Sequence, residues 1–255
     1  MPDPFESSRR KIAWAKKNFA DFDRECAAWF GERNYAAIFI EPHPNKPNHF
    51  THKLRMTKQI PEVWPDVVGT IIDSLRAALD HATYGLAITS GNQKPLNAYF
   101  PFSRDATTFE TNLKGRCADV PKEIYPLLRS FKPYKGGNER LWAVNEVCVA
   151  NKHKILIPIG SATFPAGVDF SGSGFIEMPS THVWDRTKHE MELFTLGPQT
   201  TKFNGDFKFG CYIAFGEIGS LAGEPAIPVL DQFVNMVETI LGEIEAESRR
   251  LGFIQ

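Results

Sequence analysis

Long stretches with an apolar side chain at every third or fourth position constrain the fold of this chain most strongly. They run from about Ser7 to Phe30, from just after Pro61 to about Ile88, and from Pro228 to Leu251. This spacing places the apolar side chains on one face of a helix, and each such face has to be buried against another element. Either Ser7 or Ser8 can cap the first helix. We therefore expect long helices near both ends and in the middle of the chain, packed together.

Shorter helices are expected between the long ones. The patterns predict helical pieces at about 107–114 and 121–131 and a third strong helix over 139–154, which Asn138 can cap. In this third helix Leu141, Val144, Val147 and Cys148 form the apolar stripe.

Strand patterns occupy two other regions. Residues 34–60 contain two strand-like runs around the turn-rich "HPNKPN", which predicts a hairpin. In its second strand Lys53, Arg55 and Lys58 are expected to form one polar, basic face. The segments of 155–219 predict an antiparallel sheet. One of them, "KHEME", carries His189, Glu190 and Glu192, which we interpret as a solvated face.

The order of elements is helix, hairpin, helices, sheet, helix. Because strands and helices do not alternate regularly, the order argues against a doubly wound parallel sheet and predicts an α+β fold. A chain of 255 residues can form one large domain or two small ones. We expect a single domain over 1–255, with a helical core over 7–154 that carries the hairpin 34–60, the sheet 155–219 and a closing helix over 228–251.

The net charge and the spacing of the cysteines exclude several classes of protein. The net charge is −1, so the chain has no overall basic field of the kind that marks a general DNA coat or a polybasic membrane binder. No segment is long and apolar enough for a membrane span, and the N-terminus lacks the apolar core of a signal peptide. The four cysteines have no Cys-x-x-Cys spacing. These features predict reduced thiols, a cytoplasmic location and no membrane partner.

The segment "SLRAALDHATYGLA" carries Arg76, Asp80 and His81 within the second long helix. Arg76 and Asp80 are one turn apart and share a flank. His81 lies about 140° around the helix from Arg76, so a further element must cover the region between them if they are to form one site. The alternative is a solvated Arg–Asp pair beside a packed histidine.

The third helix carries a second polar cluster, which ends in "NKHK". Glu146 and His153 lie two turns apart, where a carboxylate can raise the basicity of an imidazole. Asn145 and Lys152 share another flank, and Asn151 falls on the apolar stripe. The alternative is a polar last turn whose cations favour the helix dipole. His81, His153, Asp80 and Glu146 could also ligate a metal, but their spacing fits no metal motif, so we expect no metal and no cofactor.

The residues of this central region resemble a group of uncharacterised bacterial proteins. The shared pattern is Leu-Arg-x-Ala-Leu-Asp-His, then Phe-Pro, then Leu-Trp and Asn-x-x-Asp-Lys-His-Arg, and it covers about Ile72 to Leu156. This chain has Asn151 where the group often has aspartate and Lys154 where arginine is common. The resemblance implies a functional site without naming a reaction.

The spacing Arg76-Ala-Ala-Leu-Asp-His81 also resembles the Arg-x4-His signature of HEPN-type ribonucleases. That resemblance implies RNA cleavage without metal, usually across a homodimer interface. His81 would act as general base or acid on a ribose 2′-hydroxyl, and Arg76 would stabilise the charge on the phosphate. His153 could supply the complementary proton transfer, and Lys152 could bind phosphate.

Two functions follow from these patterns. One is a metal-independent, HEPN-like ribonuclease in bacterial stress, toxin or phage defence, with Asp80, Asn145, Glu146, Asn151 and Lys152 as substrate-binding residues. The other is a non-catalytic binding or sensing protein, in which the same clusters form a buried network that fixes the helix packing.

Overall fold

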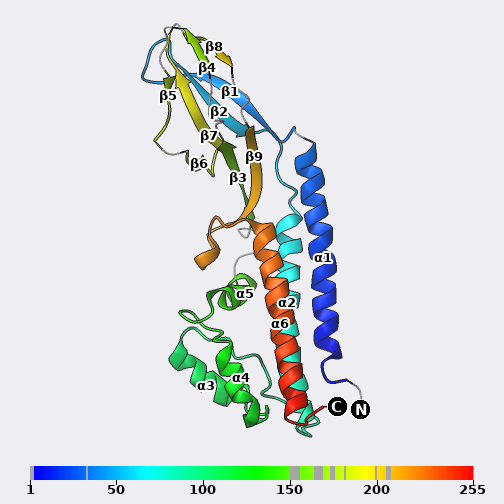
Figure 1. Ribbon diagram of the computed structural model, residues 1–255. Coiled ribbons are helices and arrows are strands. Elements are labelled where there is room, and N and C mark those ends of the chain that lie inside the picture. The colour runs from blue at the N-terminus through cyan, green and yellow to red at the C-terminus, as the bar shows by residue number, and fades with distance from the viewer. Residues whose placement is uncertain are drawn as a thin grey trace. The chain divides into compact units, whose positions relative to one another are not determined.

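The computed structural model describes residues 3–32, 34–149, 156–163, 169–172, 176–180, 182–198, 200–204 and 208–254 (Figure 1). The chain divides into two compact units, the first formed by residues 1–23, 63–155 and 215–255 and the second by residues 24–62 and 156–214. The first contains helices and the second contains the sheets, so the predicted α+β class is confirmed.

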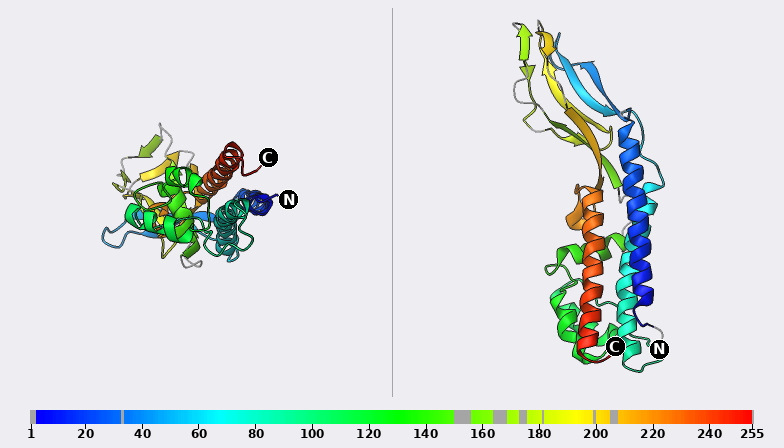
Figure 2. Two further views of the ribbon diagram at one scale, coloured as in Figure 1. Left: turned by 90° about the horizontal axis from the view of Figure 1, so that it is seen from below. Right: turned by 45° about the vertical axis from the view of Figure 1, so that its right-hand side comes forward.

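Three long helices lie side by side in the first unit (Figures 1 and 2). The N-terminal part of α1 (Glu6–Gly31) contacts both α2 (Trp64–Thr89) and α6 (Ala226–Arg250). On the α2 side the Ser8 hydroxyl donates to the Ala78 carbonyl, and on the α6 side Lys16 pairs with Glu238. The three apolar stripes predicted from the sequence meet here, and side chains such as Leu75 and Phe233 are fully buried. The predicted long helices are confirmed to within a few residues.

The shorter helices of the first unit are also close to their predicted places. They are α3 (Ala106–Arg116), the 3₁₀ turn η1 (Lys122–Ile124), α4 (Tyr125–Ser130) and α5 (Glu139–Val149), with a second 3₁₀ turn, η3 (Gly219–Leu221), before α6. The backbone N–H of Leu141 donates to the Asn138 side chain at 3.1 Å, as expected for a helix cap. The helix expected over 139–154 is described as far as Val149, and its last residues lie outside the described part.

A close contact at Gly85 fixes the start of the chain against α2. A Cβ atom at this position would lie 2.6 Å from the Pro4 carbonyl oxygen and 3.1 Å from the Phe5 ring. Phe5 itself is fully buried. Only a residue without a side chain lets the segment before α1 approach α2 so closely.

The second unit is built on antiparallel pairs. The central sheet has the order β1, β2, β7, β5, and β6 also pairs with β7. Its strands are β1 (Ala36–Pro42), β2 (Phe50–Met56), β5 (Ile176–Glu177), β6 (Trp184–Asp185) and β7 (Glu190–Leu196). Two further pairs are formed by β3 (Leu156–Thr163) with β9 (Lys208–Phe215) and by β4 (Asp169–Gly172) with β8 (Thr200–Asn204).

The hairpin predicted at 34–60 is confirmed as β1 and β2, with Ile38 opposite Leu54. The sequence pattern predicts that this hairpin belongs to the helical core. In the structure β2 pairs with β7 instead, and Leu54 is buried in one cluster with Met191 and Leu193. The physical reason is that a two-stranded hairpin buries little apolar surface alone and is completed by further strands.

Candidate functional site

The side chains of Arg76 and His81 leave α2 in different directions, as the helical spacing predicts. The Arg76 guanidinium donates from Nε to the Asn145 side chain of α5 at 3.1 Å, and from Nη1 to Asp80 at 3.1 Å. The His81 Nδ1 atom is 2.8 Å from the Ser7 hydroxyl oxygen of α1. Two different helices therefore cover the two residues.

Arg76, Asp80 and Asn145 form what we call the Arg76 network. The second carboxylate oxygen of Asp80 accepts a hydrogen bond from the Phe100 backbone N–H at 2.9 Å. The guanidinium carbon of Arg76 lies 5.6 Å from the centre of the Phe102 ring. The Arg76 and Asp80 side chains are 27% and 19% exposed. These contacts link α2 to α5 and to the segment before α3. The Arg76 network therefore has a structural role, because it holds these three parts of the chain together.

His81 faces a cavity of about 670 Å³, which we call the His81 pocket. The start of α1, the second half of α2 and the segment after α2 supply its walls. Its polar and aromatic lining includes the three acids Asp3, Glu6 and Asp80, together with Ser7, Arg10, His81, Tyr84 and Tyr99. The volume falls in the usual range for a small-molecule or cofactor site, which is about 300–1,000 Å³. Arg76 is not among the residues that line the pocket, whereas Asp80 borders both it and the Arg76 network.

The Ser7–His81 contact leaves the second ring nitrogen of His81 available. Within the described part of the chain, Nε2 makes no hydrogen bond. If Nδ1 accepts the serine proton, Nε2 carries a hydrogen and donates; if Nδ1 donates to Ser7, Nε2 is an acceptor. The imidazole can therefore give or take a proton at Nε2 while Ser7 holds the ring.

Arg10 adds a positive charge to this pocket. It lies in the first turns of α1 and is exposed, and it makes no ion pair with any residue that the structure describes. The sequence patterns do not single out Arg10, and for Ser7 they predict only a role as a helix cap. The spacing of Ser7, Arg10 and Trp14 at intervals of three and four residues was the signal that could have identified a polar face of α1.

The residues predicted on the third helix are only partly described. Asn145 joins the Arg76 network, whereas the Glu146 carboxylate lies directly against Gly219 of η3. Asn151, Lys152 and His153 lie outside the described residues, and their roles stay predictions.

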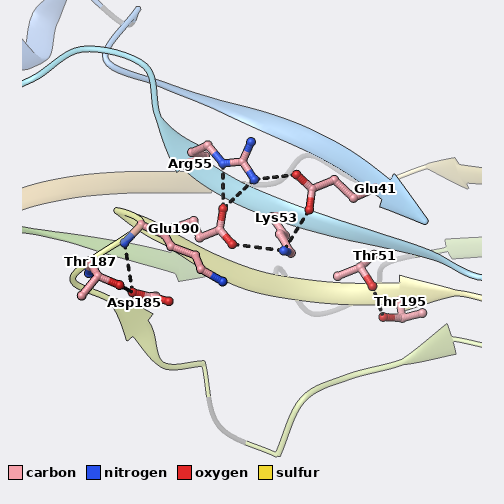
Figure 3. A network of polar contacts seen from close by, with 9 residues as sticks. Glu41, Thr51, Lys53, Arg55, Asp185, Thr187, Glu190 and Thr195 are labelled. Carbon is pink, nitrogen blue, oxygen red and sulfur yellow. Dashed lines mark hydrogen bonds and ion pairs between the residues drawn. The ribbon is translucent and has the colours of Figure 1, made fainter. Parts of the chain in front are cut away.

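The second unit holds a separate polar cluster, formed by Glu41, Lys53, Arg55 and Glu190 (Figure 3). Lys53 lies 2.9 Å from Glu41 and 3.0 Å from Glu190, and Arg55 donates to the same two carboxylates at 2.5 and 2.7 Å. The basic face expected on β2 is therefore neutralised by two acids at Lys53 and Arg55. The expectation that Glu190 is solvated is wrong, since this residue is 6% exposed.

The ion pairs of this cluster lower the pKa values of its two acids. Burial raises the pKa of Glu190, but the hydrogen bonds from Lys53 and Arg55 outweigh it and hold the pKa below the ordinary value. The pKa of Glu41 is lowered by the same two partners. Two acids and two bases satisfy one another, which leaves no spare charge for a ligand and points to a structural role.

None of the described helices has a stretch long and apolar enough to span a membrane. Nor do three His, Cys, Asp or Glu side chains of the described residues gather closely enough to hold a metal ion. Comparisons of the chain with protein-family models, with curated proteins and with solved structures gave no match.

Proposed function

We propose that this chain is a cytoplasmic, metal-independent ribonuclease that acts at the His81 pocket, in the HEPN-like manner that its Arg-x4-His spacing resembles. The observation that carries the proposal is the placement of His81, whose Nδ1 atom contacts Ser7 and which lines a cavity together with Arg10, a cation that has no ion-pair partner among the described residues. Bacterial stress response or phage defence would be its setting.

In this proposal His81 takes the proton of a ribose 2′-hydroxyl at Nε2. The 2′-oxygen then attacks the neighbouring phosphorus, the bond to the 5′-oxygen breaks, and a 2′,3′-cyclic phosphate forms. The leaving 5′-oxygen needs a proton, for which His153 is the predicted donor. Arg10 is placed to offset the charge that grows on the phosphate oxygens.

Arg76 has a different part in the proposal from the one expected from the sequence. It acts as a positioning residue, because it holds Asp80 at the edge of the pocket and anchors α2 to α5. The HEPN resemblance further implies a homodimer, which analytical ultracentrifugation would test.

The experiment measures cleavage of a single-stranded RNA oligonucleotide by purified protein in the presence of a chelator. We expect His81→Gln to lose about 10²–10⁴-fold in rate, the usual contribution of a general acid or base. His49→Gln serves as the control, since His49 lies in the β1–β2 turn of the second unit. Thermal melts of each variant establish that the fold is kept. Cleavage by His81→Gln at the wild-type rate, or activity that the chelator removes, would contradict the proposal.

A non-catalytic binding or sensing protein is the second candidate. It is favoured by the Arg76 network, whose hydrogen bonds join α2, α5 and the segment before α3. This candidate predicts no RNA cleavage by the wild-type protein under any of these conditions, together with a loss of stability in Arg76→Ala. Because the Arg76 contacts stabilise the fold in either case, the cleavage measurement separates the two candidates.

A further inference from the structure

We infer that the groove between α1 and α2 binds single-stranded RNA over more than one nucleotide, with Lys11 and Trp14 forming a second subsite beside the His81 pocket. The inference rests on the proposed ribonuclease function for the identity of the bound polymer. It adds the path of the strand along the two helices and the residues that hold it beyond the cleavage point.

The groove consists of two adjoining hollows. Next to the His81 pocket lies a second one of about 390 Å³, which we call the Trp14 hollow and which shares Ser7 and Arg10 with the first. Its other lining residues are Lys11, Trp14, Thr70 and Ser74.

The antiparallel packing of α1 and α2 aligns these hollows along both helices. Ser7 contacts His81 near one end, and the Phe22 ring packs edge-on against Trp64 at 5.6 Å near the other. Ser7 to Trp14 spans about 10 Å along α1. That length accommodates at least two stacked nucleotides, which rise about 3.4 Å each along one strand.

The charges of the Trp14 hollow match a phosphate backbone. Lys11 is exposed and, like Arg10, forms no ion pair with another residue in the described part of the chain. None of the described residues that line this hollow is acidic. By contrast, Arg9 and Lys16 on another side of α1 are neutralised by Glu245 and Glu238 of α6. Within the described residues, the cations of this part of α1 that have no ion-pair partner thus line the groove.

Exposed aromatic rings lie along the same path. Trp14 is 43% exposed in one hollow, and Tyr84 and Tyr99 are 45% and 49% exposed in the other. Unpaired bases stack on such rings, and this stacking depends little on the base sequence. The Arg116 guanidinium lies over the Tyr99 ring at 5.7 Å, so stacking is assigned to Trp14 and Tyr84. A duplex does not offer its base faces, so the combination of these exposed rings with cations that lack a partner among the described residues selects a single strand.

The test measures binding separately from cleavage. A fluorescein-labelled 12-nucleotide oligouridylate with 2′-O-methyl sugars lacks the hydroxyl that the reaction needs, and its affinity is read from fluorescence anisotropy. We expect Trp14→Leu to weaken binding about tenfold, since stacking on one ring is worth about 1–3 kcal/mol, whereas Trp14→Phe keeps most of the affinity. Lys11→Gln should weaken binding and make the salt slope shallower by about 0.7.

Lys16→Gln is the matched control, because it removes the same charge from the same helix on the side that contacts α6. The inference is overturned if wild-type protein does not bind the single strand, if it binds a 12-base-pair duplex equally well, or if Lys16→Gln has the effect of Lys11→Gln. Cleavage of unmodified RNA with loss of activity in His81→Gln would leave the proposed function intact in each of these cases. Conversely, binding without cleavage would support the groove and refute the ribonuclease.

Discussion

Two neighbouring polar residues of α2, Arg76 and His81, contact different helices. Arg76 and His81 are five residues apart on α2, yet one bonds to Asn145 on α5 and the other to Ser7 on α1. The helical repeat sets the angle between them, while the partner at each angle is supplied by a remote part of the chain. Truncation at Arg76 should therefore act on stability, and substitution at His81 should act on function.

We expect Arg76→Ala to lower the free energy of unfolding by about 2 kcal/mol, since Asp80 and Asn145 each lose a partly buried charged or polar partner. Urea denaturation measures the change. Arg104→Ala is the control, because the Arg104 side chain is 83% exposed and should change stability by less than about 0.5 kcal/mol. Equal effects of the two substitutions would show that the Arg76 network does not stabilise the fold.

The effect of a glycine-to-alanine substitution on stability depends on the contacts of the helix as well as on helix propensity. Gly85 and Gly242 both lie inside long helices, α2 and α6. A Cβ at Gly85 meets the Pro4 carbonyl, whereas a Cβ at Gly242 meets no atom within 4 Å. The same change of residue should thus have opposite signs in the two helices.

We expect Gly242→Ala to stabilise the protein by about 0.5–1 kcal/mol through the gain in helix propensity. Gly85→Ala should instead destabilise it by about 1–3 kcal/mol, because the Pro4–Phe5 segment has to move and expose the Phe5 ring. Thermal and urea melts compare the two variants. If both alanines stabilise the protein alike, the close approach of the first residues to α2 is refuted.

The whole molecule divides into two units that rest on different interactions. Apolar helix stripes dominate the first, while the sheet of the second adds an ion-pair cluster of two acids and two bases. The charges of this cluster make the stability of the second unit sensitive to acid.

Glu41 and Glu190 both have folded-state pKa values below the ordinary value of 4.5. Their contribution to stability is therefore complete above pH 4.5 and is lost as the pH falls through the lower folded-state values. We expect Glu190→Gln to be less stable at pH 7 and to lose less stability between pH 5 and 3 than the wild type. Circular dichroism melts across this range measure the effect. Glu238→Gln, which removes a carboxylate from an exposed pair with Lys16, is the control for the loss of a single negative charge.

Much of the fold could be predicted from the sequence, because each long helix and each strand pair carries its own apolar period. The pattern predicts the residues of the hairpin but not its neighbours, since no local pattern tells which distant strand will pair with β2. The prediction for Glu190 is wrong for the same reason. An alternating strand shows which residues share a face, but not that Lys53 and Arg55 of another strand lie opposite.

The candidate site likewise has a part that the sequence predicts and a part that it does not. The amino-acid pattern alone places Arg76 and Asp80 on one flank of α2 and directs His81 elsewhere, because the helical repeat is a local property. The packing of the folded chain adds three features that no local pattern contains. Asn145 of α5 bonds to Arg76, the first turns of α1 bring Ser7 and Arg10 to the His81 pocket, and a groove runs between α1 and α2. These contacts join residues more than sixty positions apart, and packing of whole faces sets them rather than any short pattern.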